Sequence, residues 1–294
     1  MSKIFLPVEI HDAIIDQLHT DTKSLSDCRL VSKQWLARAR HWAFDNREAK
    51  LISNCMPDSF YEKRDARRFI ELLHAPHSTL PTFIQCLLVY GPDLGHEASD
   101  VIGSQEDYDV LNALISEHLP LLCNLRTITI AAVTWRCLRP ESKALIASLS
   151  QVTSVIWHSI AIESLHDFLG FCSTNFSGLQ ILKIRKIKVV DPESQDVRPP
   201  SSTCRSLSRL RLLDVATDTV LRPLLSVPSM YIQPQNLETL CLTGVKINHI
   251  PLVSRFIEAA GPGLRHVALD IASGATEAET SGDCELILSH ISYD

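Results

Sequence analysis

The sequence has no long hydrophobic run, no paired cysteine motif and no excess of basic residues. No stretch approaches the roughly 18 uninterrupted apolar residues of a membrane-spanning helix. The first residues, Met1 to Glu9, reach a charge before the core of a signal peptide could form, so we expect a soluble, unsecreted chain. The nine cysteines run from Cys28 to Cys284 without a Cys-x-x-Cys pair, which predicts free thiols in a reducing compartment.

The net charge and the missing catalytic motifs argue against several classes of function. A net charge of -6 at pH 7 argues against dedicated nucleic-acid binding, which gains from a basic excess. The 12 histidines are scattered, so composition alone indicates no metal site. A Gly-x-Ser-x-Gly elbow, a Walker A loop, a Gly-x-Gly-x-x-Gly motif and a His-Glu-x-x-His motif are all missing. We therefore expect a chain that is not an enzyme and holds no cofactor; hydrolase or transferase activity is the least favoured alternative.

An apolar pattern recurs along most of the chain. The spacing apolar-x-x-apolar-x-apolar occurs seven times, and the first residues of consecutive copies are 41, 27, 27, 28, 30 and 27 residues apart. The copies are Ile84/Leu87/Val89, Leu125/Ile128/Ile130, Val152/Val155/Trp157, Leu179/Leu182/Ile184, Leu207/Leu210/Leu212, Leu237/Leu240/Leu242 and Leu264/Val267/Leu269. Between the copies, apolar residues at three-to-four spacing predict helices. Pro140 marks the start of one helix, and Asn248 and Gly261 are expected to bound the last.

These periods predict an α/β solenoid of about seven strand-helix units over residues 81–294. The 41-residue step is explained by an inserted loop between Gly91 and Gly103. Units of this length, with a short strand and a helix, resemble leucine-rich repeats. The chain departs from that family at the ninth position, where Asn or Cys is expected and where it has Val133, Ile160, Ile187, Val215 and Val245. The asparagine ladder is absent, so another feature must satisfy the backbone there.

Residues 1–50 form a different unit. Pro7 followed by Ile10 and Ile14 predicts one helix, Ser24 as N-cap predicts a second, and residues 35–44 a third. A unit this short rarely folds stably alone, so we expect its apolar face to be docked on something. Residues 51–80 are interpreted as a helical linker between this unit and the repeats.

The same residues resemble an F-box. The F-box pattern is Leu-Pro-x-Glu-Ile, an apolar helix, and Leu-x-x-Cys-x-Leu-Val-x-x-x-Trp; it is matched by residues 6–10, by Ile14 and Leu18, and by residues 25–35. An F-box followed by divergent leucine-rich-like repeats is similar to the expanded F-box families of mushroom-forming fungi. The resemblance implies a substrate-recognition adaptor of an SCF-type cullin-RING ubiquitin ligase, working in the cytoplasm or the nucleus.

In that family the F-box binds the Skp adaptor, and through it a cullin, while the repeats hold the target protein. The resemblance therefore implies these adaptor-binding residues: Leu6, Pro7, Ile10, Ile14, Leu18, Leu30, Val31 and Trp35. Apolar side chains at i, i+4 and i+8 with a buried aromatic also suit a helix-in-groove interface. One alternative stays open: the same helices could cap the first repeat, which would leave a protein-binding scaffold without a ligase.

The strands also predict a target-binding surface. Because side chains alternate along a strand, the third, fifth and seventh positions of each copy face away from the buried ones. In the fourth and fifth copies this puts Lys183, Arg185, Arg209 and Arg211 on one concave surface, with Lys183 beside Arg211. These four cations suit an acidic or phosphorylated target segment. The plainer interpretation is a solvated strand face whose charges serve solubility.

Two groups of metal-ligating side chains are weaker candidates. Asp12, Asp16 and His19 share one face of the first helix, and His74-x-x-His77 lies in a proline-containing turn. The first group lies on a face that is expected to be solvated, and the second lacks the further ligands that zinc requires. The sequence therefore predicts no metal site.

Overall fold

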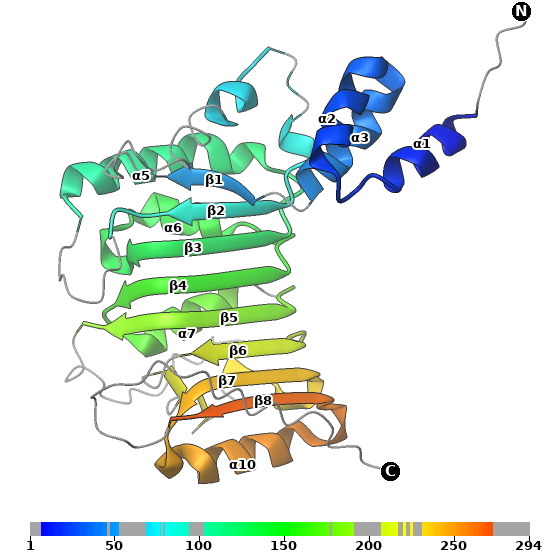
Figure 1. The fold of residues 1–294 in the computed structure, drawn as a ribbon. Helices are drawn as coiled ribbons and strands as arrows, with labels where there is room; N and C mark the ends of the chain where they lie inside the picture. Colours follow the sequence, from blue (N-terminus) through cyan, green and yellow to red (C-terminus); the bar gives the residue numbers. More distant parts are fainter. Residues whose placement is uncertain are drawn as a thin grey trace, which may run out of the picture.

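The structure is a computed structural model of the 294-residue chain, shown in Figure 1. It describes residues 7–45, 48–52, 69–76, 78, 80–93, 103–176, 178–190, 207–216, 220–221, 224–225 and 231–272. Among these residues, no helix is both long enough and apolar enough to cross a membrane.

In the described part of the chain, eight parallel strands form one open sheet in which the spatial order is the order along the chain. The strands are β1 (Glu48–Ile52), β2 (Cys86–Tyr90), β3 (Thr127–Thr134), β4 (Ser154–Ile162), β5 (Ile181–Val189), β6 (Leu212–Ala216), β7 (Thr239–Val245) and β8 (His266–Ile271). The sequence predicted seven of these strands and missed β1, which crosses the expected boundary at residue 50. In β1, Ala49 stands opposite Leu87 of β2, and alanine is too weak an apolar signal to complete the pattern.

Among the described residues, the helices that follow strands lie on one face of the sheet, and none of them covers the other face, here called the open face (Figure 1). The helices that follow strands are α5 (Gln105–His118), α6 (Pro140–Ala147), α7 (Leu165–Asn175) and α10 (Ile250–Ala260). The start of α6 at Pro140 and the end of α10 at Gly261, whose φ is +66°, are as predicted. Asn248 was wrong as a cap, because α10 begins after His249 and has no side-chain cap. Short 3-10 turns join several elements: Leu80–Thr82, Leu119–Leu121, Trp135–Cys137, Pro234–Asn236, Ile247–His249 and Gly261–Gly263.

The repeating apolar residues form the core between the sheet and these helices. Except for the last copy and Leu212, every residue of the predicted triads is buried. The fifth copy, however, lies in another register: Leu213 stands opposite Leu182 of β5 and Leu240 of β7, so the repeating triad is Leu210/Leu213/Val215. The segment from Leu207 to Leu213 contains enough leucines to fit the repeat pattern in two registers. The register predicted from the spacing was the wrong one.

A left-handed backbone residue recurs at the eighth position of four copies. The φ angles are 53° at Ala132, 54° at Ser159, 55° at Lys186 and 72° at Gly244. This bulge shifts the alternation of side chains by one residue, so that in β4 both Trp157 and Ile160 are buried. The apolar ninth position is thereby turned into the core, where Ile160 stands opposite its counterparts in β3 and β5. Val215, counted at the ninth position from sequence, stands at the sixth.

Candidate protein-interaction surfaces

The N-terminal residues form a three-helix unit with its own capping. The helices are α1 (Val8–Asp16), α2 (Thr22–Val31) and α3 (Lys33–Asp45). The N-cap of α2 is Asp21, whose carboxylate accepts hydrogen bonds from the backbone of Lys23 and Ser24 at 3.1 Å each; Ser24, expected in that role, lies inside the helix. The hydroxyl of Ser32 accepts from the backbone of Trp35 at 3.2 Å and starts α3. Two short polar links therefore set the turns between the helices.

This three-helix unit has a small core that is separate from the core of the sheet. Its buried residues are Ile15, Leu25, Cys28 and Ala39, with Leu18, Trp35 and Trp42 packed against them. None of these residues belongs to the large cluster under the sheet. In Figure 1 the unit stands at one corner, beside the first strands and outside the two layers of sheet and helices.

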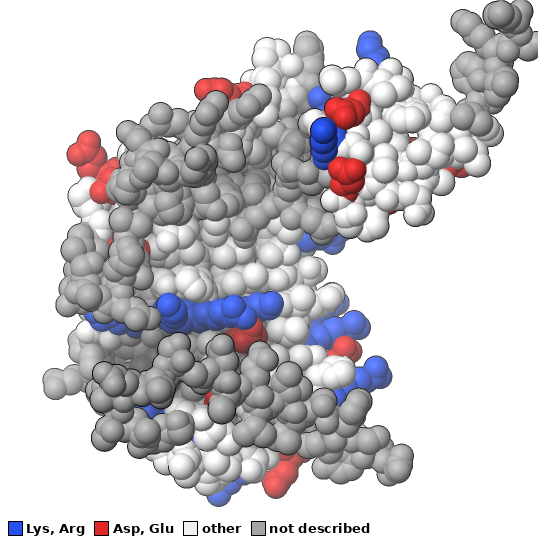
Figure 2. All heavy atoms as spheres, in the orientation of Figure 1, with Lys and Arg blue, Asp and Glu red and all other residues white. Residues whose placement is uncertain are grey.

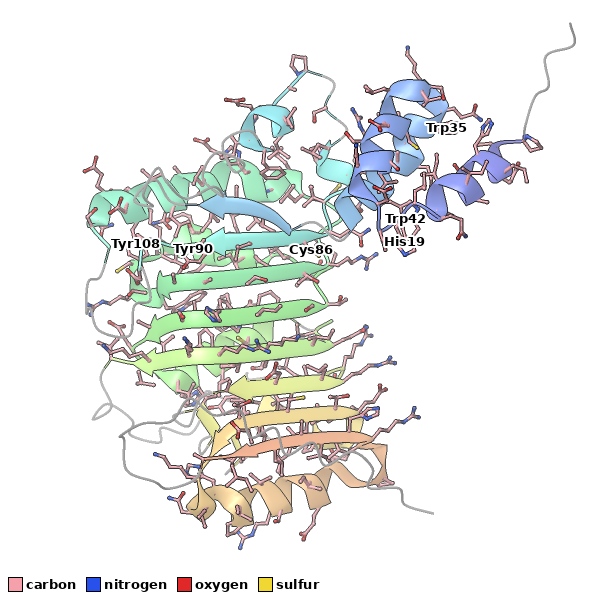
Figure 3. All side chains as sticks on the ribbon, viewed as in Figure 1. His19, Trp35, Trp42, Cys86, Tyr90 and Tyr108 are labelled. Carbon is pink, nitrogen blue, oxygen red and sulfur yellow. The ribbon has the colours of Figure 1, made fainter. Side chains whose placement is uncertain are left out.

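Asp16, the last residue of α1, links this helix to α3. Its carboxylate accepts hydrogen bonds from Arg38 at 2.5 and 2.7 Å and from the indole nitrogen of Trp42 at 2.6 Å. The hydrogen bond from Arg38 to this carboxylate is the main reason why the pKa of Arg38 is raised. The ring of His19 packs against Trp42 in a tilted arrangement, with ring centroids 5.4 Å apart (Figure 3). Both oxygens of Asp16 are thus occupied, and in the described part of the chain no three metal-ligating side chains come together.

The predicted adaptor-binding residues fall into two groups. Ile10, Ile14, Leu30 and Val31 are 44–86% exposed, and Pro7 is exposed as well. Leu18 and Trp35 are half-buried against the unit's own core, so both stabilise the unit itself. Leu6 lies outside the described residues. The sequence analysis missed Val8, which is 44% exposed on the same helix as Ile10 and Ile14.

The predicted patch of four cations is corrected by the register of β6. Lys183 stands opposite Asp214, not Arg211. Arg209 and Arg211 precede β6 at the amino-terminal edge of the sheet, where the backbone of Arg211 donates to Gln180. The guanidinium of Arg211 lies 3.6 Å from Glu238 along that edge. Only Lys183 and Arg185 of the four lie on the open face of a strand.

Asp214 is the residue that sequence analysis missed at this face. Its carboxylate accepts a hydrogen bond from Arg185 at 2.8 Å and is 11% exposed, whereas the Arg185 side chain is 49% exposed. Asp214 could not be found from the sequence because the register of β6 was unknown. Once Leu213 is paired with Leu182, the next residue, Asp214, must face outward beside Lys183. The cations of β5 form the continuous blue row across the sheet in Figure 2, with an acidic side chain beneath it.

A second polar cluster closes the insertion between β2 and α5. Asp93 accepts hydrogen bonds from the backbone of Gly103 at 2.8 Å, from the hydroxyl of Tyr108 at 2.7 Å and from the hydroxyl of Thr134 at 2.5 Å. Burial, followed by the hydrogen bond to Asp93, raises the pKa of Tyr108. This cluster brackets the inserted segment and positions the end of β3, and its polar groups are paired with one another.

The remaining candidates for chemistry are three cysteines that are buried or half-buried and a pair of histidines of which His118 is buried. Burial raises the pKa of Cys172 to about 12, and burial is also the main cause of the raised pKa of Cys137 and Cys241, so these thiols stay protonated at neutral pH. His74 meets His118, with Nε2 and Nδ1 2.9 Å apart, while His77 lies outside the described residues. These groups serve packing and hydrogen bonding, and the exposed surfaces described above are the features suited to a partner.

No family model and no curated protein matches this chain. The resemblances to an F-box and to leucine-rich repeats therefore rest on the motif residues alone.

Proposed function

We propose that this protein is a substrate-recognition adaptor of an SCF-type cullin-RING ubiquitin ligase. In this proposal residues 1–50 act as an F-box on the Skp adaptor, the strand-helix units bind the target protein, and the chain itself catalyses no reaction. Its site of action would be the cytoplasm or the nucleus, where such ligases work.

The observation that carries the proposal is the apolar surface of the three-helix unit. Five large apolar side chains in residues 7–45 are 44–86% exposed: Val8, Ile10, Ile14, Leu30 and Val31. Ile10 and Ile14 are one turn apart on α1, and Leu30 and Val31 close α2. Exposed apolar side chains concentrated in one small unit are typical of a protein-protein interface. A partner with an apolar groove would bury them.

The sheet supports the second half of the proposal, a leucine-rich-repeat-like solenoid. The eight strands are parallel and in chain order, and neighbouring copies align the same repeat positions. Repeat arrays of this type present one extended surface that is free of helices and is used for binding. The left-handed eighth position, which turns an apolar ninth residue into the core, would take the place of an asparagine ladder in this chain.

The alternative is a protein-binding scaffold in which the three helices merely cap the repeats. A cap excludes water by merging its apolar residues with those of the first repeat. Here the two cores share no buried residue among those described, and Ile10 and Leu30 face solvent instead. This arrangement favours the adaptor interpretation over the cap.

Co-purification with a fungal Skp adaptor tests the proposal. The test variant is Ile10→Asp with Leu30→Asp, because both side chains are exposed and their replacement leaves the unit's core intact. Trp35 is avoided, since its removal would unfold the helices and lose binding for that reason alone. Ile247→Asp, at a residue 67% exposed on the far end of the chain, is the matched control.

Wild type and Ile247→Asp should bind the adaptor alike, while the double variant should bind at least about 30-fold more weakly. Circular dichroism should show the same helix content in all three proteins. If the wild-type chain fails to bind any Skp adaptor, the proposal is wrong and the scaffold without a ligase takes its place.

A further inference from the structure

The open face of the sheet carries one localised charged group at β4, β5 and β6. Lys183 of β5 stands between Ile156 of β4 and Asp214 of β6, and Arg185 stands opposite His158 of β4. Arg185 donates to Asp214 at 2.8 Å. Two cations, one carboxylate and one histidine therefore occupy neighbouring positions of three adjacent strands.

The strands on either side of this group are uncharged at the positions that face the same way. In β2, β3 and β7 these positions hold Cys86, Leu88, Tyr90, Thr127, Thr129, Ala131, Thr239, Cys241 and Thr243. Lys186 and Lys188 continue the basic character along β5, and both are exposed. From β2 to β7 the result is one basic stripe along β5, with uncharged positions on β3 and β7 (Figure 2); further along the sheet, β8 places the acidic Asp270 on the same face. A stripe of one sign in neutral surroundings attracts and orients a ligand of the opposite sign.

Asp214 sets the strength of that attraction. Its side chain is 11% exposed and lies beside Lys183 and Arg185, so it is a fixed anion beneath the surface. It uses one nitrogen of the Arg185 guanidinium, which has five N–H donors in all. A carboxylate that arrives from solvent must share Arg185 with Asp214. At the anchoring position itself the charges of Lys183, Arg185 and Asp214 sum to +1, which one carboxylate neutralises, and Lys186 and Lys188 can attract further carboxylates of the same segment.

We infer that this face binds a carboxylate-rich segment of the target protein, with Lys183 and Arg185 as its anchoring cations and Asp214 as an internal competitor that limits its affinity. The inference rests on the proposed function only in taking the ligand to be a segment of a target protein. It differs from a general basic surface in one respect: removal of a single buried carboxylate should tighten binding.

The pKa of His158 provides an independent readout of whether an anion binds at this place. Its pKa is lowered, first by burial and then by the positive charges of Lys186 and Arg185. The groups facing it from β3 and along β4 are uncharged, and Asp214 lies beyond Arg185 on β6. A bound carboxylate beside Arg185 would offset those positive charges. The pKa of His158 should therefore rise when ligand binds.

The test uses the full chain without any adaptor and a fluorescein-labelled oligoglutamate peptide, with oligoglutamine and a phosphoserine peptide as comparisons. Fluorescence anisotropy gives the affinity at low and at physiological ionic strength, and the His158 ring signals are followed by NMR. Lys183→Ala and Arg185→Ala should each weaken oligoglutamate binding about tenfold. Asp214→Asn should tighten it about fivefold.

Two matched controls separate this site from overall charge. Asp270→Asn removes the same charge from the exposed surface of β8, and Arg211→Ala removes an arginine at the edge of the sheet; both should leave the affinity within about twofold. Equal effects of Asp214→Asn and Asp270→Asn would overturn the inference, as would tighter binding of the phosphoserine peptide or an unmoved His158. Because no adaptor is present, these results do not depend on whether a ligase forms.

Discussion

Gly91 packs directly against the backbone of Ala132, so that a Cβ on Gly91 would overlap the carbonyl oxygen of Ala132. The same backbone stretch accepts a hydrogen bond from the Gly91 nitrogen, at the Ala131 oxygen and 2.8 Å. The end of β2 therefore approaches β3 more closely than any other residue type permits.

Gly91→Ala should destabilise the sheet by about 1–3 kcal/mol, because the strands must separate or shift to admit one methyl group. Denaturant unfolding, followed by far-ultraviolet circular dichroism, measures the change. Gly178→Ala is the control, since a Cβ there meets its nearest atoms at 3.5 Å, an ordinary contact distance. Equal midpoints for Gly91→Ala and wild type would contradict this packing.

The left-handed eighth positions predict two substitutions of opposite sign. At Gly244, φ is 72° and a Cβ would meet no atom within 4 Å, so Gly244→Ala tests conformation alone and should destabilise by about 1 kcal/mol. At Ser159, with φ 54°, Ser159→Gly relieves the same strain and should be neutral or stabilising by up to about 1 kcal/mol. Thermal unfolding of the two variants should bracket that of wild type.

These positions also show how far sequence reasoning reaches. The buried triads of β3, β4 and β7 were predictable, since leucine, isoleucine and valine recur there at constant spacing and nothing competes with that register. The eighth-position bulge was not, because Ala132, Ser159 and Lys186 are not glycines and give no local sign of a positive φ. Only Gly244 carries such a sign.

The binding surfaces were predictable to a different extent. The F-box-like spacing predicted Ile10, Ile14, Leu30 and Val31 as partner contacts; the structure leaves all four exposed, and their role in binding stays a prediction. On the sheet, an excess of leucine between Leu207 and Leu213 hid the true register, and with it Asp214. Neighbour relations across strands depend on register, so one misplaced strand was enough to turn an ion pair into a row of four cations.

Asp16 is expected to hold the three-helix unit together. Asp16→Ala removes the partner of Arg38 and of the Trp42 indole, and should destabilise that unit by about 1–2 kcal/mol, a range that allows for the partial exposure of the pair. Since the unit's core is separate, the sheet should unfold at an unchanged temperature. Glu9→Ala, at an exposed residue of the same helix, is the control. A single transition that shifts as a whole would contradict the separation of the two cores.

His118 should make the stability of the sheet depend on pH. His118 is 2% exposed, and its pKa is lowered from 6.5, first by burial and then by the positive charge on His74. As the pH falls below 6.5, the unfolded chain takes up a proton that the folded chain accepts only at lower pH. The contribution of His118 to stability is therefore complete above that pH and is lost as the pH falls through this window.

The free energy of unfolding should thus decrease between about pH 7.5 and 5.5, most steeply in wild type. His118→Gln removes the titrating group and should give the shallowest profile. His74→Gln removes the neighbouring positive charge and replaces the ring that hydrogen-bonds to His118 with a neutral amide, so the pKa of His118 should be lowered less and the profile should lie between the other two. If the three profiles are parallel, groups other than His118 cause the acid sensitivity. If wild type is steepest, His74→Gln intermediate and His118→Gln shallowest, the acid sensitivity comes from the histidine pair that joins residues 69–76 to the end of α5.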